Sequence, residues 1–323
     1  MEQNPKIIIC DCDHNNVDME KSVFDKAHCG FKWLHCHTED EVIKECQGAV
    51  CFLNQYAPMN EKVFKGVPSL KMIVRYGVGV DNVNLEDADK YGVQICNVPD
   101  YGMNEVADHA LTLMLACVRK AWLLGNRTKE GAWNYAESIP VHRLSTLTVG
   151  IVGTGRIGSE FAKRVKALGC RIIAFDPNYK SLSRHFPQDI TYCASLDELL
   201  KQSDVISMHC SLNAGNHHMM NKEAFGKMKD GSYFINVSRG GLVDEDALNE
   251  ALSSKKLAGA GIDVVNQEPL DHNSPLFKHP NLIITPHMAW YSEEAALELK
   301  RKCAEEAVRF LNGEPVRYPI NHI

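Results

Sequence analysis

Short apolar runs alternate with amphipathic stretches along the first third of the sequence. The apolar runs cover 6–10, 31–36, 49–53, 71–75 and 93–96, and the segments between them, such as 60–65 and 84–90, carry apolar residues at helical spacing. This alternation is typical of a parallel sheet covered by helices. The N-terminal part is therefore predicted to be a doubly wound α/β unit.

A long helix is predicted over 104–125, and after an irregular stretch the same pattern starts again. The second set of predicted strands covers 147–152, 171–175, 205–209, 233–237, 258–264 and 282–285. A final helix over 292–311 should end at Asn312-Gly313, with Pro315 beyond it as a stop. We expect an α/β fold of two doubly wound units, Rossmann-like or flavodoxin-like, with a cleft between them.

Length and charge narrow the class of protein. A chain of 323 residues corresponds to two domains at about 150 residues each. The net charge of −6 lacks the basic footprint of a nucleic-acid or anionic-membrane binder. The longest apolar stretch, 110–118, is too short and too polar at its flanks to span a bilayer, and MEQNPKIIIC has no signal-peptide core. We expect a cytoplasmic protein that binds neither nucleic acid nor membranes.

Twelve cysteines are compatible with a reducing compartment, where thiols need no disulfide framework. Two segments, Cys10-Asp11-Cys12-Asp13-His14 and His35-Cys36-His37, leave a metal site open as an alternative. No CxxC pair and no HxxxH spacing accompanies them. Buried or surface thiols are favoured over a metal site.

A glycine-rich turn follows the predicted strand 147–152. It reads Gly153-Thr154-Gly155-Arg156-Ile157-Gly158 and opens a helix over 159–168. In such a turn Gly153 permits the bend, Gly155 lets a pyrophosphate approach the backbone, and Gly158 allows close packing, while the helix N-terminus offers its amides to phosphate. The next predicted strand ends at Asp176, placed to bind ribose hydroxyls and to repel a 2′-phosphate. NAD is therefore predicted as the cofactor.

Polar residues at the carboxyl ends of the later strands are candidates for chemistry, because ligands of open α/β sheets bind there. Arg239, Asp263 and His287 each follow a predicted strand, and Glu268 precedes Pro269. Oxidation of a 2-hydroxy acid needs a base, a group that orients the base and a cation for the carboxylate. His287, Glu268 and Arg239 could supply these functions, although each taken singly could be an ordinary loop residue.

Together these segments resemble the D-isomer-specific 2-hydroxyacid dehydrogenase family. The resemblance rests on the order and spacing of the glycine motif with Asp176, Asn236–Asp244, Gly261–Val264, Glu268-Pro269 and Thr285-Pro286-His287, and it covers nearly the whole chain. It implies a cofactor domain, 102–291, inserted into a substrate domain, 1–101 plus 292–323. It also implies a homodimer formed through the helix over 104–125.

The resemblance further implies a role for each site residue. Arg239 would orient the carboxylate and carbonyl of a small 2-oxo or 2-hydroxy acid, His287 would be the acid/base, and Glu268 would pair with it. The cofactor-binding set would be Gly153, Gly155, Arg156, Ile157, Gly158, Asp176, His209, Cys210, Val237, Ser238 and Asp263. The substrate set would be Arg75, Val78, Gly79, Tyr101 and Trp290.

Within the family, the stretch Pro286–Glu293 together with Asn216-His217-His218 resembles the C-terminal binding proteins, NAD-binding corepressors. Much of the chain also resembles phosphoglycerate dehydrogenases. Leu53-Asn54-Gln55-Tyr56 stands where the latter usually carry a phosphate pocket, which weakens the case for a phosphorylated substrate. An NAD-gated interaction module remains the alternative. Because no basic targeting block is present, an NAD-dependent dehydrogenase is favoured.

Overall fold

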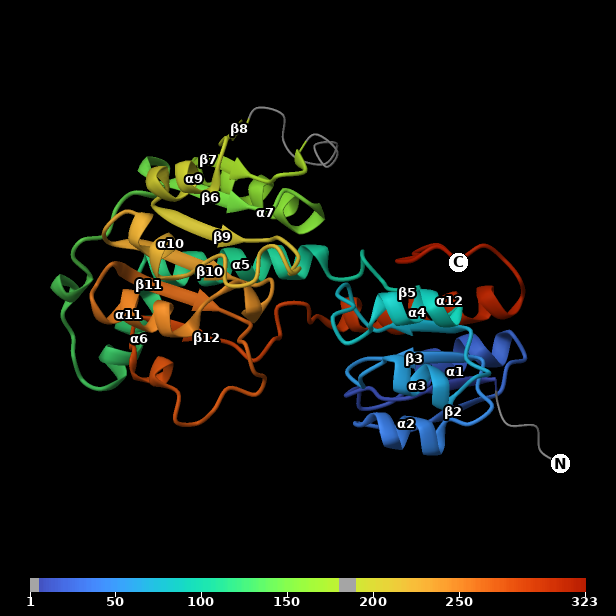
Figure 1. Ribbon diagram of the computed structural model, residues 1–323. Coiled ribbons are helices and arrows are strands. Elements are labelled where there is room, and N and C mark those ends of the chain that lie inside the picture. Colours follow the sequence, from blue (N-terminus) through green and yellow to red (C-terminus); the bar gives the residue numbers. More distant parts are fainter. Residues whose placement is uncertain (1–5, 180–189) are drawn as a thin grey trace. The chain divides into compact units, whose positions relative to one another are not determined.

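The computed structural model describes residues 6–179 and 190–323. The chain divides into two compact units, Met1–Gly102 with Ser292–Ile323, and Met103–Tyr291 (Figure 1). The first five residues, on which the expectation of no export signal partly rests, lie outside the described residues. Each unit is described by itself.

The first unit contains a parallel five-stranded sheet in the order β2-β1-β3-β4-β5. Its strands are β1 (Ile7–Ile9), β2 (Phe31–Trp33), β3 (Cys51–Asn54), β4 (Met72–Arg75) and β5 (Gln94–Cys96). Its helices are α1 (Asp18–Lys26), α2 (Glu39–Glu45), α3 (Glu61–Gly66), α4 (Leu85–Tyr91) and α12 (Glu293–Leu311). This is the flavodoxin-like order, in which the strand order reverses between β1 and β3.

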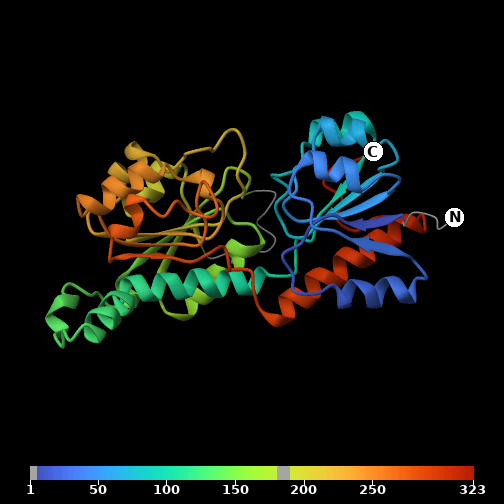
Figure 2. The same cartoon turned by 90° about the horizontal axis from the view of Figure 1, so that it is seen from below.

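Helices cover both faces of this sheet. The first and last helices of the chain, α1 and α12, lie side by side on one face, and α2, α3 and α4 cover the other (Figure 2). Several helices begin at the residue types that sequence rules favour for an N-cap: Thr38 forms a capping box with Glu41, and the side chains of Asn60, Asn84 and Ser292 accept amide hydrogen bonds. The expected end of the last helix is confirmed, since Gly313 has φ +69°.

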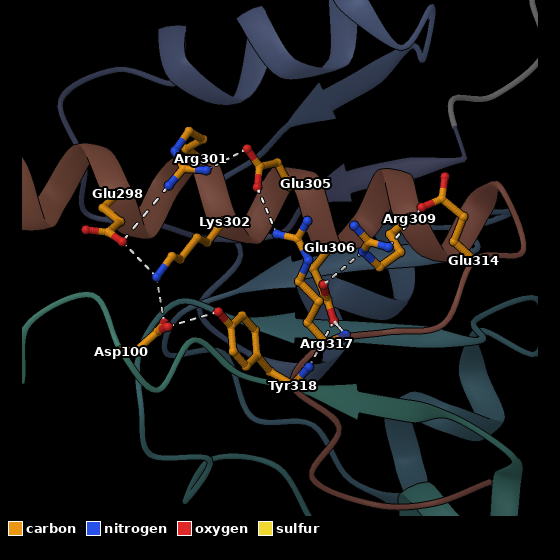
Figure 3. A network of polar contacts seen from close by, with 10 residues as sticks. All are labelled: Asp100, Glu298, Arg301, Lys302, Glu305, Glu306, Arg309, Glu314, Arg317 and Tyr318. Atoms are coloured by element: carbon orange, nitrogen blue, oxygen red, sulfur yellow. Dashed lines mark hydrogen bonds and ion pairs between the residues drawn. The ribbon is translucent and has the colours of Figure 1, made fainter. Parts of the chain in front are cut away.

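Polar contacts attach the C-terminal tail to the first unit (Figure 3). Glu306, buried on α12, accepts hydrogen bonds from the backbone amides of Arg317 and Tyr318 at 2.5 and 3.2 Å. Asp100 accepts from the Lys302 ammonium at 2.7 Å and from the Tyr318 hydroxyl at 2.9 Å. The tail thereby fixes the segment immediately before Tyr101, a predicted substrate residue.

The second unit contains a parallel seven-stranded sheet in the order β12-β11-β10-β9-β6-β7-β8. Its strands are β6 (Thr148–Val152), β7 (Arg171–Phe175), β8 (Thr191–Tyr192), β9 (Val205–Met208), β10 (Ser232–Asn236), β11 (Leu257–Ile262) and β12 (Leu282–Ile284). Its α-helices are α5 (Met103–Val118), α6 (Ala121–Lys129), α7 (Arg156–Ala167), α9 (Leu196–Gln202), α10 (Lys222–Lys227) and α11 (Glu245–Ser253). The order reverses between β6 and β9, as in Rossmann folds.

The two doubly wound α/β units confirm the predicted fold class. The core of the second unit has two layers: one buried cluster lies between the sheet and α5 with α7, and the other lies under α9, α10 and α11. Predicted and observed strand ends differ by a few residues at most, which is ordinary for element boundaries.

Two details of the sequence interpretation were wrong. The helix expected over 104–125 is two helices, because Lys120 takes the left-handed conformation at φ +51° and separates α5 from α6. α5 packs on the sheet, whereas α6 has no buried residue, so the chain leaves the core after Val118. The two-residue strand β8 was not predicted, because a strand that short has no usable periodicity.

Candidate active site

Glu268 and His287 meet in loops that follow β11 and β12. The imidazole Nδ1 lies 2.6 Å from the Glu268 Oε2 oxygen, and both side chains are partly exposed. An ionised carboxylate only accepts hydrogen bonds, so it selects the tautomer that carries a proton on Nδ1. Nε2 is then the ring nitrogen that can exchange a proton with a ligand.

The charge state of Glu268 suits this pairing. Burial raises the pKa of Glu268, but the hydrogen bond and charge of His287, with a smaller effect of the Arg239 guanidinium, lower it by more, so the net shift is downward. The carboxylate is therefore ionised at neutral pH and stabilises a protonated imidazole.

Asp263 fixes the turn that carries His287. Its buried carboxylate accepts hydrogen bonds from the Thr285 hydroxyl at 2.5 Å and from the Met288 and Ala289 amides at 3.0 and 2.9 Å. The His287 amide donates to the Asp263 carbonyl at 2.8 Å. These bonds hold His287 at φ +51°, a conformation that costs free energy for a non-glycine residue.

His109 on α5 also takes part in this arrangement. Its Nε2 lies 2.9 Å from the Thr285 hydroxyl and 3.6 Å from Asp263 Oδ1. Neither His109 nor Thr285 was among the residues predicted for the site. The available signal was a histidine within the apolar helix pattern of 104–125, which by itself does not show what the ring contacts.

Arg239 follows β10 in a loop that packs against the loop of Glu268. A Cβ at Gly240 would lie 2.0 Å from the Val265 carbonyl group, so only glycine allows this approach. The Val265 amide in turn donates to Glu268 Oε1 at 3.2 Å. The carbonyl of Arg239 accepts from the Asn236 side chain at 2.9 Å, which fixes the start of its loop. The sheet thus brings the cation, the carboxylate and the imidazole to one edge.

The glycine motif forms the turn between β6 and α7. Gly153 has φ +96°, and a Cβ there would lie 2.6 Å from backbone atoms of His209 and Cys210. A Cβ at Gly158 would lie 2.1 Å from the Gly153 carbonyl oxygen. At Gly155 a Cβ would meet nothing within 4 Å, so the backbone at this residue is open to a ligand.

The N-terminus of α7 adds to this opening. The helix begins at Arg156, earlier than the predicted 159, with Gly155 as an N-cap that has no side chain to bond the first amides. The amides of the first turn, from Arg156 and Ile157 onward, therefore meet the opening at Gly155. A phosphate placed there would satisfy these donors.

Asp176 lies at the end of β7, beside the glycine turn. Its Oδ2 accepts from the Thr154 amide at 2.8 Å, and its Oδ1 accepts from the Asn178 amide at 2.8 Å. Thr154, whose hydroxyl also contacts Asp176 at 3.2 Å, was not predicted to have this role. The structure thus places Asp176 directly against the motif, through a hydrogen bond to Thr154, which lies 22 residues earlier in the sequence.

His209 and Cys210 follow β9, on the other side of the glycine turn. The His209 ring lies tilted at 36° against Phe161 of α7 with the ring centroids 4.7 Å apart, and its Nε2 contacts the Ser207 hydroxyl at 2.8 Å. Burial lowers the pKa of His209 to about 3 and raises the pKa of Cys210 to about 11. Both side chains are therefore uncharged at neutral pH. Val237 and Ser238 follow β10 nearby, and the Ser238 hydroxyl donates to the Met208 carbonyl at 2.8 Å.

In the first unit, Arg75 ends β4 and begins a tightly held loop. Gly77 has φ +132°, and a Cβ there would lie 1.7 Å from an Arg75 guanidinium nitrogen, so the guanidinium lies over this glycine. Tyr76 is buried, and its hydroxyl donates to Glu20 on α1 at 2.9 Å. The Val78 carbonyl accepts from Asn97 at 2.6 Å. Val78 and Gly79 therefore occupy a fixed position at the edge of the sheet.

The predicted site residues thus fall into two sets by unit. The first unit holds Arg75, Val78, Gly79 and Tyr101, and the second holds the catalytic and cofactor-binding residues with Trp290. Trp290 packs partly buried against the core of the second unit and meets Tyr291 edge to face at 5.4 Å. In the described ranges, no three His, Cys, Asp or Glu side chains are arranged to bind a metal ion, and all twelve cysteines are free thiols.

Comparison with known proteins bears on this arrangement. Residues 111–289 match the family described as D-isomer specific 2-hydroxyacid dehydrogenase, NAD binding domain. The chain belongs to this family.

Relatives extend over nearly the whole chain. Glycerate dehydrogenase from Methylorubrum extorquens is 34% identical over 310 residues, covering 94% of this chain and 96% of that protein. D-3-phosphoglycerate dehydrogenase from Archaeoglobus fulgidus is 36% identical over 286 residues, covering 88% of this chain but 54% of that protein. The structure of D-lactate dehydrogenase from Aquifex aeolicus, complexed with NAD and lactic acid, has a TM-score of 0.85 and 28% identity, and the match covers 95% and 96% of the two chains.

Family membership makes this chain an NAD-dependent D-2-hydroxyacid dehydrogenase acting on a small hydroxy or oxo acid. The corepressor alternative is not favoured. The structure fits the cofactor, because the space at Gly155, the uncapped start of α7 and the carboxylate of Asp176 are the three features that a dinucleotide requires. None of the helices in the described ranges combines the length and apolar character needed to cross a bilayer.

Proposed function

We propose that this dehydrogenase reduces unphosphorylated 2-oxo acids to D-2-hydroxy acids, with His287 as the proton donor. The 2.6 Å hydrogen bond between Glu268 and His287 is the observation that carries the proposal. It fixes the imidazole tautomer and keeps a negative charge beside the ring, as an acid/base catalyst working near neutral pH requires.

The residues at this edge have distinct roles in reduction. His287 gives the Nε2 proton to the carbonyl oxygen, which becomes the hydroxyl, and Glu268 stabilises the imidazolium before that transfer. Arg239 orients the substrate and polarises the carbonyl. Bound NADH supplies the hydride for the carbonyl carbon. In the reverse direction His287 accepts the hydroxyl proton.

The cofactor is held by residues of the 102–291 domain. Gly155, with the amides of Arg156 and Ile157, would bind the pyrophosphate, while Gly153 and Gly158 shape the turn that presents it, and Asp176 would bind the adenosine ribose. His209 and Cys210 border the adenine side. The Val237 carbonyl and Asp263 hold the nicotinamide amide, next to Ser238.

The substrate carboxylate is bound by residues of the discontinuous domain, 1–101 plus 292–323. The amides of Val78 and Gly79 donate hydrogen bonds to this carboxylate, and Arg75 supplies the positive charge, with Tyr101 close by. The hydrogen bonds that hold the Arg75–Gly79 loop support this assignment, since a fixed loop presents its amides without further ordering.

Trp290 provides an apolar wall for the side chain of the substrate. Burying part of an aliphatic chain against an indole contributes about 1–3 kcal/mol, so longer apolar 2-oxo acids should be preferred over pyruvate and glyoxylate by roughly ten- to a hundredfold. Phosphohydroxypyruvate should be a poor substrate, since Leu53-Asn54-Gln55-Tyr56 offers no cation for its phosphate and a desolvated dianion without a partner is costly.

The test is a panel of 2-oxo acids varied in size, charge and phosphorylation, with NADH oxidation followed by absorbance. We expect unphosphorylated acids to have the highest kcat/KM, and Trp290→Ala to reduce kcat/KM most for the longest apolar chains. The proposal fails if phosphohydroxypyruvate is the best substrate. A uniform loss across the panel in Trp290→Ala contradicts the role of the indole alone.

The proposal also includes the oligomeric state and the compartment: the protein forms a homodimer and lies in the cytoplasm. Trp133 and Tyr135, which follow α6, are 92% and 82% exposed, and large exposed aromatic residues are typical of a surface that a partner covers. A second copy of the chain is the occupant that the family resemblance implies. The free thiols support a reducing compartment. Sedimentation of the wild type and of Trp133→Glu tests the dimer.

A further inference from the structure

Tyr56 is exposed, although hydrogen bonds hold both its hydroxyl and its backbone amide. It follows β3, next to β1, where the strand order reverses and where ligands of such sheets bind. The residue is 56% exposed, yet its hydroxyl donates to Asp13 Oδ2 at 3.0 Å. Its amide donates to Asp11 at 2.5 Å.

The loop behind Tyr56 is held by a buried carboxylate. Asp11, at the end of β1, accepts hydrogen bonds from the amides of Gln55 and Ala57 at 3.0 and 3.1 Å and from the Asn54 side chain at 2.9 Å. The Asp13 amide donates to the Gln55 side chain at 2.9 Å. An aromatic ring restrained at both ends loses little conformational entropy when a ligand packs on it.

Asp13 gives this wall a negative charge. Its side chain is 54% exposed, and its Oδ1 lies 3.9 Å from the Nε2 of His14. Burial, together with the charge of Lys300, lowers the pKa of His14 to about 4, so this histidine is neutral at pH 7 and does not compensate the carboxylate. Desolvation and the Asp13 charge raise the pKa of Tyr56, which therefore remains a neutral hydrogen-bond donor.

Arg75 lies opposite Asn54 in the pairing of β4 with β3, and its charge acts on Tyr56. Under the proposed function, this guanidinium is engaged by the substrate carboxylate. A second anionic group on the substrate would then meet Asp13 instead of a cation. The Asp13 carboxylate and a second anionic group repel each other, and the repulsion increases as water is displaced from between them.

We propose that Asp13, held by Tyr56, determines specificity by charge: it rejects 2-oxo acids whose side chain carries a second anion and admits uncharged side chains. The inference rests on the proposed function and deepens it, because it assigns discrimination to a carboxylate of the first unit in addition to the indole of Trp290. The class of substrate is a monoanionic 2-oxo acid.

The test compares two substrates of nearly the same shape. Oxaloacetate carries a carboxylate where 4-methyl-2-oxopentanoate carries an isopropyl group. We expect the wild type to favour the uncharged acid, and Asp13→Asn to reduce the ratio of the two kcat/KM values by three- to tenfold. The ratio in the wild type should also fall as salt is added, and Asp13→Asn should remove most of that dependence.

Two variants sharpen the comparison. Tyr56→Phe releases the Asp13 carboxylate but keeps its charge, so the ratio should change less than in Asp13→Asn. Asp25→Asn removes an equally exposed carboxylate from α1 and should leave the ratio unchanged. The inference is overturned if the ratio of the two kcat/KM values in Asp13→Asn stays within twofold of the wild-type ratio. It is also overturned if Asp25→Asn changes this ratio as much as Asp13→Asn does. Absence of activity toward every 2-oxo acid overturns the proposed function, and the inference with it.

Discussion

Gly158 packs directly against Gly153: a Cβ at Gly158 would lie 2.1 Å from the Gly153 carbonyl oxygen. Gly155, between them in the sequence, meets nothing within 4 Å of its own Cβ position. The motif therefore contains two glycines that the fold requires, Gly153 and Gly158, and one, Gly155, whose space is left to a ligand.

This contrast predicts separable effects of substitution. Gly155→Val should leave the Tm within about 3 °C of the wild type, because its backbone is in the extended region, and should weaken NADH binding at least tenfold. Gly158→Ala should destabilise the protein by about 2 kcal/mol or more. Calorimetry and NADH fluorescence titration measure the two effects. A stable Gly158→Ala variant would contradict the packing argument.

Asp176 leads to a prediction about cofactor choice. The wild type should prefer NADH to NADPH, since the carboxylate binds the ribose hydroxyls and repels a 2′-phosphate. Asp176→Asn removes the negative charge but keeps an acceptor for the Thr154 amide. It should therefore reduce the preference for NADH over NADPH and cause little loss of stability. Kd values for both cofactors provide the measurement. Equal affinities in the wild type would count against the assignment.

The pairing of Glu268 with His287 predicts a shift in the pH profile. His287→Ala should lower kcat by about a hundredfold or more and retain NADH binding. The downward pKa shift of Glu268 keeps it ionised at neutral pH, where its charge favours the imidazolium. Glu268→Gln removes that charge, so the pH range of efficient reduction should move to lower pH. Unchanged kcat in His287→Ala would falsify the role of the ring.

Burial of the His209 ring predicts that the folded protein loses stability as the pH falls. Because the folded pKa is about 3, below the usual value of 6.5, the neutral ring is favoured by the fold. The stability it contributes is complete above pH 6.5 and is lost progressively as the pH falls toward 3. At pH 5 the loss amounts to about 2 kcal/mol.

Calorimetry at pH 7 and pH 5 on His209→Gln tests this, with the exposed His272→Gln as control. The decrease in Tm between the two pH values should be smaller in His209→Gln than in the wild type and unchanged in His272→Gln. Equal decreases in all three proteins would show that other groups cause the acid lability.

The sequence by itself determined the elements and the fold class. Strand and helix periodicity, and punctuation such as Asn312-Gly313, are local signals, so they predicted nearly every strand and the end of α12. The glycine motif and the acidic residue at the next strand end were also visible, since both lie within one strand-helix-strand segment.

Only the tertiary structure decided the break at Lys120 and the partners of the site residues. α6 leaves the core after the break at Lys120 and has no buried residue, which depends on the extent of the sheet and not on local propensity. Asp13 reaches Tyr56, 43 residues away in sequence, because the strand order places β1 beside β3. His109 reaches Thr285 because α5 packs on β10, β11 and β12 of the second sheet, and Thr285 follows β12. Contacts between loops follow strand order, and strand order is set by packing the whole sheet between its helices.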